Sequence, residues 1–338
     1  MIFDVKPKES QKELLFRDEE VRKLTGLMEA GIWTVVMGPR MVGKTSLIKV
    51  ASKGIRSVYV NLWGARGLND LLERMLRGLS RDSVWRRVLS SVDSLSLGPL
   101  PSITLRNRSK VIGDILGELG SQGKVVVILD EVQELRSVTK PLWDLLSYTF
   151  YTYPNVSFVF TGSVSGLIRV ILSPPPGSPL VGRKPVKLEL APFTENQSRE
   201  FLRLGFKEAG LPVGGEIEEA TSELDGIPGW LTLYGYLRLH QGLSHLDAIE
   251  QTRVEACKVL KEAFSHFLED KRNKDLYLEL IRRLPSRWSE IKRSLNVSDE
   301  VLSESLKSLQ DWFFIKKINE TYDVQDRMMR YCALSGLL

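Results

Sequence analysis

The 338-residue sequence is poor in residues that commonly hold metal ions or build disulfide frameworks. It has two cysteines, Cys257 and Cys332, and three histidines, and their spacing matches no zinc site and no disulfide scaffold. We therefore expect two unpaired thiols in a reducing cytoplasm. No apolar run approaches the ~18 residues that cross a bilayer, and charges interrupt residues 1–16, so we expect neither a membrane span nor a signal peptide.

The composition is that of a folded globular protein with ample material for cores. Hydrophobic residues make up 43% of the chain and charged residues 26%, a balance that argues against disorder. The length suggests two or three domains. The net charge of +5 and a pI near 9.0 permit a nucleic-acid partner without requiring one.

The strongest local signal is a glycine-rich loop, GPRMVGKT at residues 38–45, which matches G-x-x-x-x-G-K-[ST] at every fixed position. Residues 34–37 before it predict a buried strand, and the residues after it predict a helix. Backbone N–H groups of such a loop surround phosphates, while Lys44 would reach the β- and γ-phosphates and Thr45 would ligate Mg²⁺. The sequence therefore predicts ATP or ADP and Mg²⁺ at Gly38, Pro39, Arg40, Met41, Val42, Gly43, Lys44, Thr45 and Ser46.

A second element supplies two adjacent carboxylates. Residues 125–129 form a continuous apolar run that predicts a central strand buried on both faces. Asp130 follows at the carboxyl end of the strand, where open α/β sheets bind ligands, and it would complete the Mg²⁺ shell as a Walker B aspartate. Glu131 is placed to orient and deprotonate an attacking water. This pair favours ATP hydrolysis over the small-GTPase arrangement, in which a glutamine positions the water.

Further strands are predicted at residues 57–64, 155–168 and 184–193, with helical segments between them. The alternation predicts an α/β fold whose core is a three-layer parallel sheet of the P-loop type. The strand at residues 155–168 contains Thr161 and Ser163. Either side chain could contact the γ-phosphate or the water, and either could instead cap the following helix.

Several stretches occur together in a family-specific order. They are LFRDEEVRKL, GPRMVGKTSLI, VVVILDEVQEL, FVFTGS, SPLVGRKPVKLELAPF and DGIPGWLTLYG. From about residue 15 to residue 235 the sequence resembles the archaeal ATPase family of P-loop proteins, in the AAA+-like STAND branch. The resemblance implies a slow, partner-stimulated ATP hydrolase whose core is followed by a helical lid and, as is usual in the family, a winged helix.

The resemblance also implies further site residues. Phe16 and Arg17 match a segment on the adenine side of the nucleotide, although a packed phenylalanine beside a surface arginine would read the same way. Arg183 matches an arginine that reaches a nucleotide in AAA+ relatives, in cis or from a neighbour; the alternative is a surface arginine in a Pro/Gly-rich loop. Pro228 matches the G-x-P motif of the STAND lid, and a proline also suits the first turn of a helix. The G-x-P motif favours a nucleotide-gated switch over a cycling motor.

The predicted domains are a P-loop ATPase core at residues 1–191, a helical lid at 192–270 and a winged helix at 271–338. Strand signals disappear in the second segment, where helices are expected, one of them starting at Thr194. In the third, two helices precede one that Ser298 would cap, and two short strands surround Asn319 and Glu320. The capped helix is acidic and complements phosphates poorly, while basic residues gather on the first two helices and the wing.

The sequence thus predicts a molecular switch in which Mg–ATP closes core and lid and a winged helix reads out the change. One alternative is a nucleotide-dependent module that binds duplex DNA and resembles archaeal replication initiators. Another is a STAND-type assembly scaffold with a protein partner, in which the winged helix never touches DNA. The sequence sets no oligomeric state.

Overall fold

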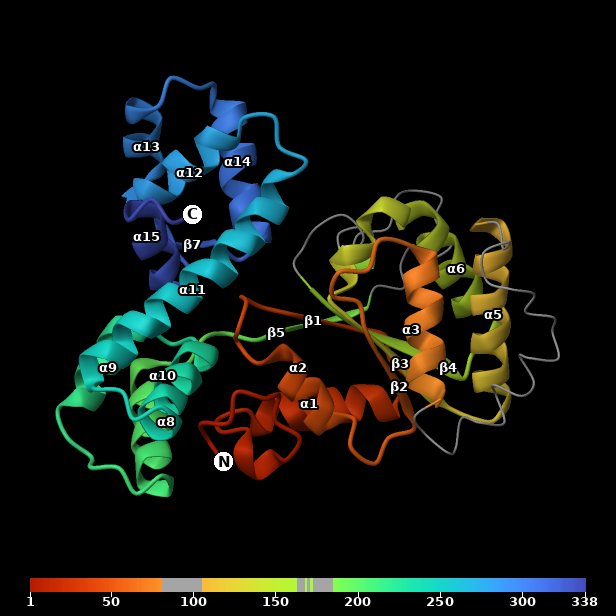
Figure 1. Cartoon of the computed structure of the whole chain (residues 1–338). Coiled ribbons are helices and arrows are strands. Elements are labelled where there is room, and N and C mark those ends of the chain that lie inside the picture. The colour runs from red at the N-terminus through yellow and green to blue at the C-terminus, as the bar shows by residue number, and fades with distance from the viewer. Residues whose placement is uncertain (81–104, 163–167, 169–170, 173–184) are drawn as a thin grey trace. The chain divides into compact units, whose positions relative to one another are not determined.

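The computed structural model describes residues 1–80, 105–162, 168, 171–172 and 185–338 (Figure 1). Its contacts divide into two compact units. The first comprises Met1–Phe16, Gly38–Ser46 and Leu190–Leu338, and the second comprises Arg17–Met37 and Leu47–Glu189. The division into core, lid and winged helix stays a prediction. Within the described ranges, no helix has the length and apolar character needed to cross a membrane.

The second unit contains a five-stranded parallel sheet with the strand order β2-β3-β4-β1-β5. Its strands are β1 (Thr34–Met37), β2 (Ser57–Asn61), β3 (Val125–Asp130), β4 (Val156–Thr161) and β5 (Val186–Glu189). Every residue of β1, β3 and β4 is buried, as their apolar runs predict for strands covered on both faces. The sheet confirms the predicted α/β class.

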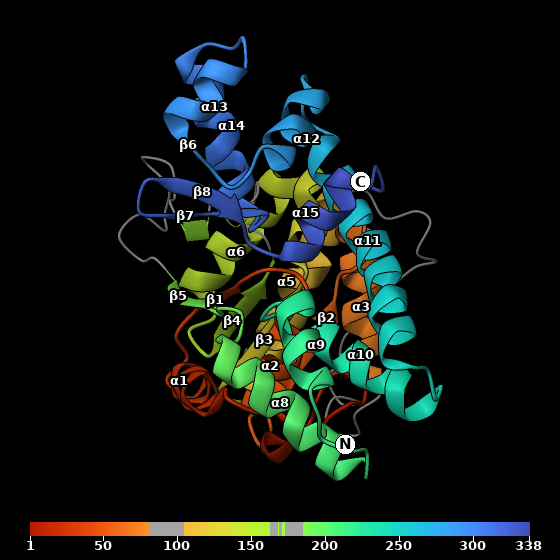
Figure 2. The ribbon, with the colours of Figure 1, turned by 90° about the vertical axis from the view of Figure 1, so that its left-hand side faces the viewer.

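Helices cover both faces of this sheet. In Figures 1 and 2, α3, α5 and α6 lie together on one face, and α1 lies on the opposite side. The segments involved are α1 (Asp18–Glu29), α2 (Lys44–Ala51), α3 (Leu68–Ser80), α5 (Leu105–Ser121), the 3₁₀ segment η4 (Val132–Val138) and α6 (Thr139–Thr152). The α3 helix shows why: its leucines recur at helical spacing, and Leu68, Leu71, Leu72 and Leu79 are buried.

The first unit contains a bundle of four helices after the sheet strands. They are α8 (Glu195–Glu208), α9 (Glu216–Leu224), α10 (Pro228–His240) and α11 (His245–Leu268), and a short 3₁₀ turn η1 (Gln11–Glu13) precedes them in the chain. Thr194 begins α8 as predicted, in a capping box with Gln197. Pro228 is the first residue of α10, where its missing N–H costs no helical hydrogen bond.

The N-terminal segment completes the core of this bundle. The Phe3 ring is 1% exposed and packs edge-to-face on Phe201 and Phe206, with ring centroids 6.1 and 5.9 Å away. A Cβ at Gly205 or Gly235 would overlap the Phe3 ring, so the two helices α8 and α10 present glycines where the ring enters. Residues about 200 positions apart in the sequence therefore share one core.

The C-terminal part of the first unit combines helices with a small antiparallel sheet of order β6-β8-β7 (Figure 2). Ser298 caps the third helix, and two strands surround residues 319–320, both as predicted. The sequence did not predict β6 or the last helix. The elements are α12 (Lys274–Arg282), β6 (Ser286–Arg287), α13 (Trp288–Ser294), α14 (Asp299–Asp311), β7 (Ile315–Ile318), β8 (Thr321–Val324) and α15 (Arg327–Leu334).

The expectation of two unpaired thiols is wrong, because Cys257 of α11 and Cys332 of α15 form a disulfide. Their Cα atoms lie 5.4 Å apart although 75 positions separate them in the sequence. Sequence spacing could not show this, since the pairing depends on α15 returning to pack along α11.

A buried carboxylate joins the start of α15 to helix α10. Asp326 Oδ2 accepts a hydrogen bond from Trp230 Nε1 at 2.7 Å, while Oδ1 caps the N–H of Met328 at 2.8 Å. Burial raises the pKa of Asp326 to about 7, and the charge of Asp225 acts in the same direction while Lys316 opposes it. The same short segment therefore caps one helix and anchors another.

Candidate functional site

The glycine-rich loop follows directly from the carboxyl end of β1. Gly38 has φ +147°, which L side chains rarely adopt, and a Cβ there would lie 2.6 Å from the Leu190 carbonyl oxygen. The Lys44 side chain is buried, and its Nζ donates to the carbonyl oxygens of Gly38 and Pro39, both at 2.9 Å. Lys44 is the first residue of α2, and its ammonium group is therefore held by backbone carbonyl groups of the same loop.

The first turn of α10 contacts this loop within the first unit. The Gly229 N–H donates to the Met41 carbonyl oxygen at 3.0 Å, and a Cβ at Gly229 would lie 2.6 Å from Met41 Cβ. The glycine that directly follows the G-x-P motif is therefore packed on the loop. Ser46, at the other end of the loop, accepts a hydrogen bond from the Lys8 N–H at 3.0 Å.

Phe16 joins the same region through Phe193. The two rings meet edge-to-face with centroids 5.5 Å apart, and the Phe193 N–H donates to the Gly226 carbonyl oxygen at 2.7 Å. Phe16 has φ +60°, an uncommon backbone conformation for a non-glycine residue. The first unit therefore brings together Phe16, the phosphate-loop residues and the segment around Pro228.

Asp130, the Walker B aspartate of the sequence analysis, is the last residue of β3 and is 1% exposed. Its Oδ2 accepts a hydrogen bond from the Tyr59 hydroxyl at 2.5 Å, and its Oδ1 accepts one from the Thr161 hydroxyl. Burial, with the nearby Asp130 charge, raises the pKa of Tyr59, so the phenol stays a donor. Three adjacent strands, β2, β3 and β4, thus fix this carboxylate.

Glu131 follows in a left-handed turn with φ +60°. Its N–H donates to the Thr161 hydroxyl oxygen at 2.9 Å, so one threonine contacts both acidic residues. The Gln133 amide nitrogen donates to the Glu131 carboxylate. Thr161 therefore lies beside both acidic residues.

The other predicted site residues fall in different places. Arg17 is 5% exposed and pairs with Glu20 at 3.1 Å, so it is not the surface arginine of the alternative reading; burial lowers the pKa of its guanidinium. Ser163 and Arg183 lie outside the described residues. The sequence analysis did not identify Tyr59 and Gln133, which hydrogen-bond to Asp130 and Glu131. The only sequence signals for them are a polar ring in a strand and the D-E-x-Q spacing.

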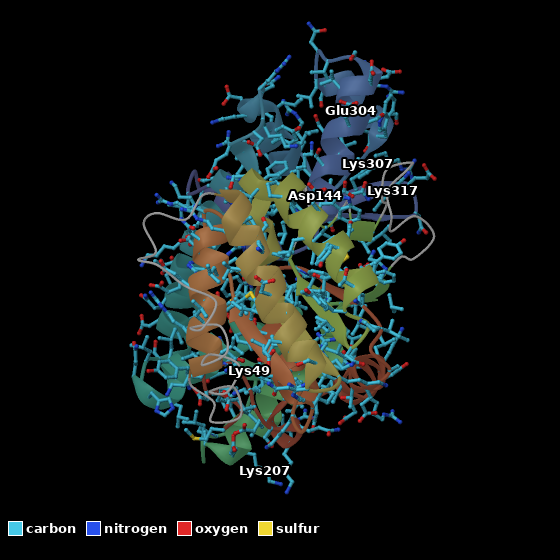
Figure 3. All side chains as sticks on the ribbon, turned by 90° about the vertical axis from the view of Figure 1, so that its right-hand side faces the viewer. Lys49, Asp144, Lys207, Glu304, Lys307 and Lys317 are labelled. Carbon is cyan, nitrogen blue, oxygen red and sulfur yellow. A yellow bond between two sulfur atoms is a disulfide. The ribbon has the colours of Figure 1, made fainter. Side chains whose placement is uncertain are left out.

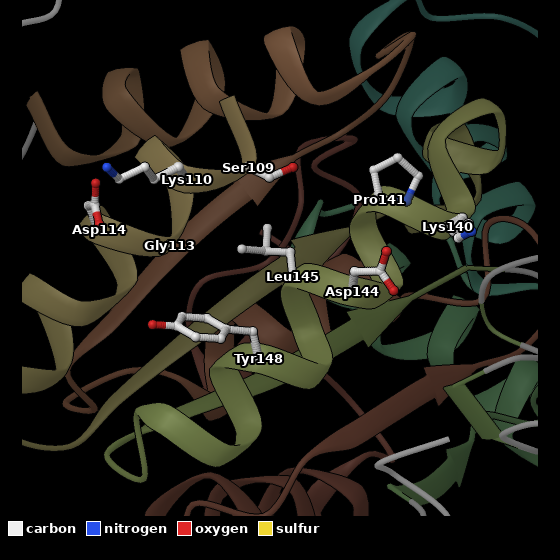
Figure 4. A pocket seen from close by; sticks show the side chains of 9 residues that line it. All are labelled: Ser109, Lys110, Gly113, Asp114, Lys140, Pro141, Asp144, Leu145 and Tyr148. Atoms are coloured by element: carbon white, nitrogen blue, oxygen red, sulfur yellow. The ribbon is translucent and has the colours of Figure 1, made fainter. Parts of the chain in front are cut away.

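A separate cavity of about 630 Å³ lies between α5 and α6 (Figure 4). Its lining includes Lys110 and Asp114 of α5 and Asp144 and Tyr148 of α6. None of the predicted site residues that the structure describes lines it. The cavity is therefore separate from the strand ends at Met37 and Asp130.

These features define a P-loop ATPase. Residues 15–233 match a family described as an ATPase domain predominantly from Archaea, and the chain belongs to that family, which confirms the predicted archaeal ATPase family. No curated protein matches the sequence.

Solved structures agree with this assignment. A Walker-type ATPase of Pyrococcus abyssi is similar over 99% of this chain and 100% of that one, with 28% identity and a TM-score of 0.79. The ORC2 protein of Aeropyrum pernix, in ADPNP–ADP complexes, matches over 99% and 96% of the two chains, with 14% identity and a TM-score of 0.58. Its ADP form has 13% identity, a TM-score of 0.54 and coverage of 99% and 98%. The ORC2 matches bear on the fold alone.

Proposed function

We propose that the protein is an ATP-hydrolysing switch in which nucleotide at the phosphate loop controls the lid helices. The observation that carries this is the hydrogen bond from Gly229 N–H to the Met41 carbonyl oxygen. Because Met41 belongs to the phosphate loop and Gly229 opens α10, a phosphate that reorders the loop changes a contact of the lid. A ligand shifts such an equilibrium only through its different affinity for the two arrangements.

The residues present fit ATP with Mg²⁺. Lys44 supplies a cation for the phosphates, and the Thr45 hydroxyl and Asp130 carboxylate are hard oxygen ligands of the kind that Mg²⁺ takes. The ion would neutralise charge on the phosphates when bound. Asp130 is held by hydroxyl donors from β2 and β4, so its orientation is set before any ligand arrives. Further roles we assign are adenine-side packing for Phe16 and Arg17, nucleotide contact for Pro228, Arg183 and Ser163, and support of the attacking water for Thr161.

Glu131 is the proposed general base. It directly follows the Walker B aspartate, and its backbone is fixed by Thr161. Glu131→Gln keeps the shape but removes the base, so we expect turnover to fall by about 100-fold or more while ADP and ATP affinities stay within about twofold. Steady-state ATP turnover and calorimetric nucleotide binding test this. Retained turnover in Glu131→Gln refutes the assignment of the base.

The C-terminal elements have the order of a winged helix, and we propose that this module reads out the switch. Three of its basic residues form ion pairs with neighbouring carboxylates. Arg282 and Arg283 both pair with Glu279, at 3.3 and 3.0 Å, and Lys292 pairs with Asp299 at 2.7 Å. On α14, Lys307 has Glu304 for a neighbour, one turn away, while Lys317 lies on β7 (Figure 3).

This charge pattern favours a protein partner over duplex DNA. We further propose that the partner stimulates an otherwise slow turnover. Duplex binding releases counterions and depends steeply on salt, whereas a docking surface for protein need not. Titration of a labelled duplex at about 50 and 200 mM salt separates the two. Salt-sensitive binding at low salt together with DNA-stimulated turnover would instead favour the alternative, a nucleotide-dependent DNA-binding module.

A further inference from the structure

The side chain of the proposed base has one hydrogen-bond partner that the sequence analysis did not find. The Gln133 amide Nε2 donates to Glu131 Oε2 from two residues further along the chain. Glu131 is partly exposed, whereas Gln133 is 3% exposed. A side chain confined by packing therefore holds one that solvent would otherwise leave free to change rotamer.

The backbone around the pair is already fixed. Glu131 stands at φ +60° and donates its N–H to Thr161, which is itself bonded to Asp130. Such a conformation is unfavourable for a non-glycine residue and persists where surrounding contacts impose it. With the backbone set, the orientation of the Glu131 carboxylate depends on its side-chain torsions alone.

The neighbouring strand end is shaped around the glutamine. A Cβ on Gly162 would overlap Gln133 Oε1, so only glycine at this position leaves enough space for the side-chain amide of Gln133. Gly162 directly follows Thr161, so residues at the end of β4 hold the Walker B aspartate, the Glu131 backbone and the Gln133 side chain.

A glutamine is a poor choice here for stability alone. Among the described residues, Gln133 Oε1 is buried with no hydrogen-bond partner. An unsatisfied buried acceptor destabilises the folded state, and an apolar side chain of equal length would avoid that penalty. Unlike an apolar side chain, the amide of Gln133 can donate a hydrogen bond to the Glu131 carboxylate.

We propose that Gln133 is the positioning residue that orients the Glu131 carboxylate for its reaction with water, an inference that rests on the proposed function. With Oε2 held by the amide, Oε1 is the oxygen left to accept the proton of the attacking water. A general base works only within hydrogen-bond reach of that proton, so a carboxylate that changes rotamer freely spends less time in productive geometry. Gln133 itself touches neither water nor nucleotide in this role.

The test removes the amide donor of Gln133 and keeps the length of the side chain. Gln133→Met should lower kcat by about 10- to 100-fold. KM for ATP and the affinity for ADP should stay within about twofold. The melting temperature should stay level or rise, because the unsatisfied acceptor is gone. Gly162→Ala should lower kcat in the same way by displacing the amide, and Gln122→Met, at an exposed glutamine after α5, is the matched control.

Each outcome decides between the proposals. Unchanged or raised kcat in Gln133→Met, with Glu131→Gln inactive, overturns the positioning role and leaves the proposed base intact. Loss of kcat together with a lower melting temperature or weaker ADP binding shows a structural role and also overturns it. Turnover that survives Glu131→Gln overturns the proposed base, and the positioning role with it.

Discussion

The Cys257–Cys332 disulfide should contribute several kcal/mol to the stability of the first unit. It closes a loop of 75 residues, and the chain-entropy relation gives a denatured-state entropy loss of about 15 cal/mol/K for that length. At 25 °C this corresponds to about 4 kcal/mol. Both cysteines are almost fully buried, so replacing them with alanine changes little on the surface.

Equilibrium urea unfolding with and without reductant measures this contribution. Reductant should lower the unfolding free energy of the natural protein by about 4 kcal/mol, to the level of the double variant Cys257→Ala/Cys332→Ala. The double variant is the control, because reductant should leave it unchanged. A change below about 1 kcal/mol in the natural protein would refute the entropic reasoning. Alkylation of two thiols in the denatured, unreduced protein would refute the pairing itself.

Three further predictions concern the first unit. Because burial raises the pKa of Asp326 to about 7 from a normal 3.8, protonation favours the folded state, and stability from this group falls as the pH rises toward 7. Unfolding free energy should therefore be about 1 kcal/mol higher at pH 6 than at pH 8, and Asp326→Ala should abolish that difference in urea titrations. Thr194→Ala removes the α8 cap and should cost about 1 kcal/mol in the same assay; no loss would show that the cap is redundant. Gly235→Ala would drive a Cβ into the Phe3 ring and should cost about 1–3 kcal/mol, whereas Gly235→Ala combined with Phe3→Leu should cost less than the sum of the two single changes.

The sequence predicted best what depends on local patterns. The phosphate loop was recognised because its fixed positions follow an apolar run, and β3 because residues 125–129 are apolar without interruption. Thr194 and Ser298 were identified as helix starts because capping acts over three residues. These elements place the loop and the first carboxylate at the carboxyl ends of parallel strands.

The sequence predicted least well what depends on distant pairing. Tyr59 reaches Asp130 only because β2 lies beside β3 in register, and the disulfide forms only because α15 packs along α11. Gln133 is close to Glu131 in sequence, yet its role depends on the left-handed turn between them and on the space left by Gly162. Such contacts have no periodic signal and no fixed spacing.

The packing of Phe3 in the helical bundle has a consequence for synthesis of the chain. Its ring packs between glycines of α8 and α10, and Gly235 is translated more than two hundred residues after Phe3. At about 5–20 residues per second, the N-terminal segment waits some tens of seconds on the ribosome for its partner. During that interval the Phe3 ring has no bundle core to enter, and translation pauses before residue 235 should lengthen its exposure.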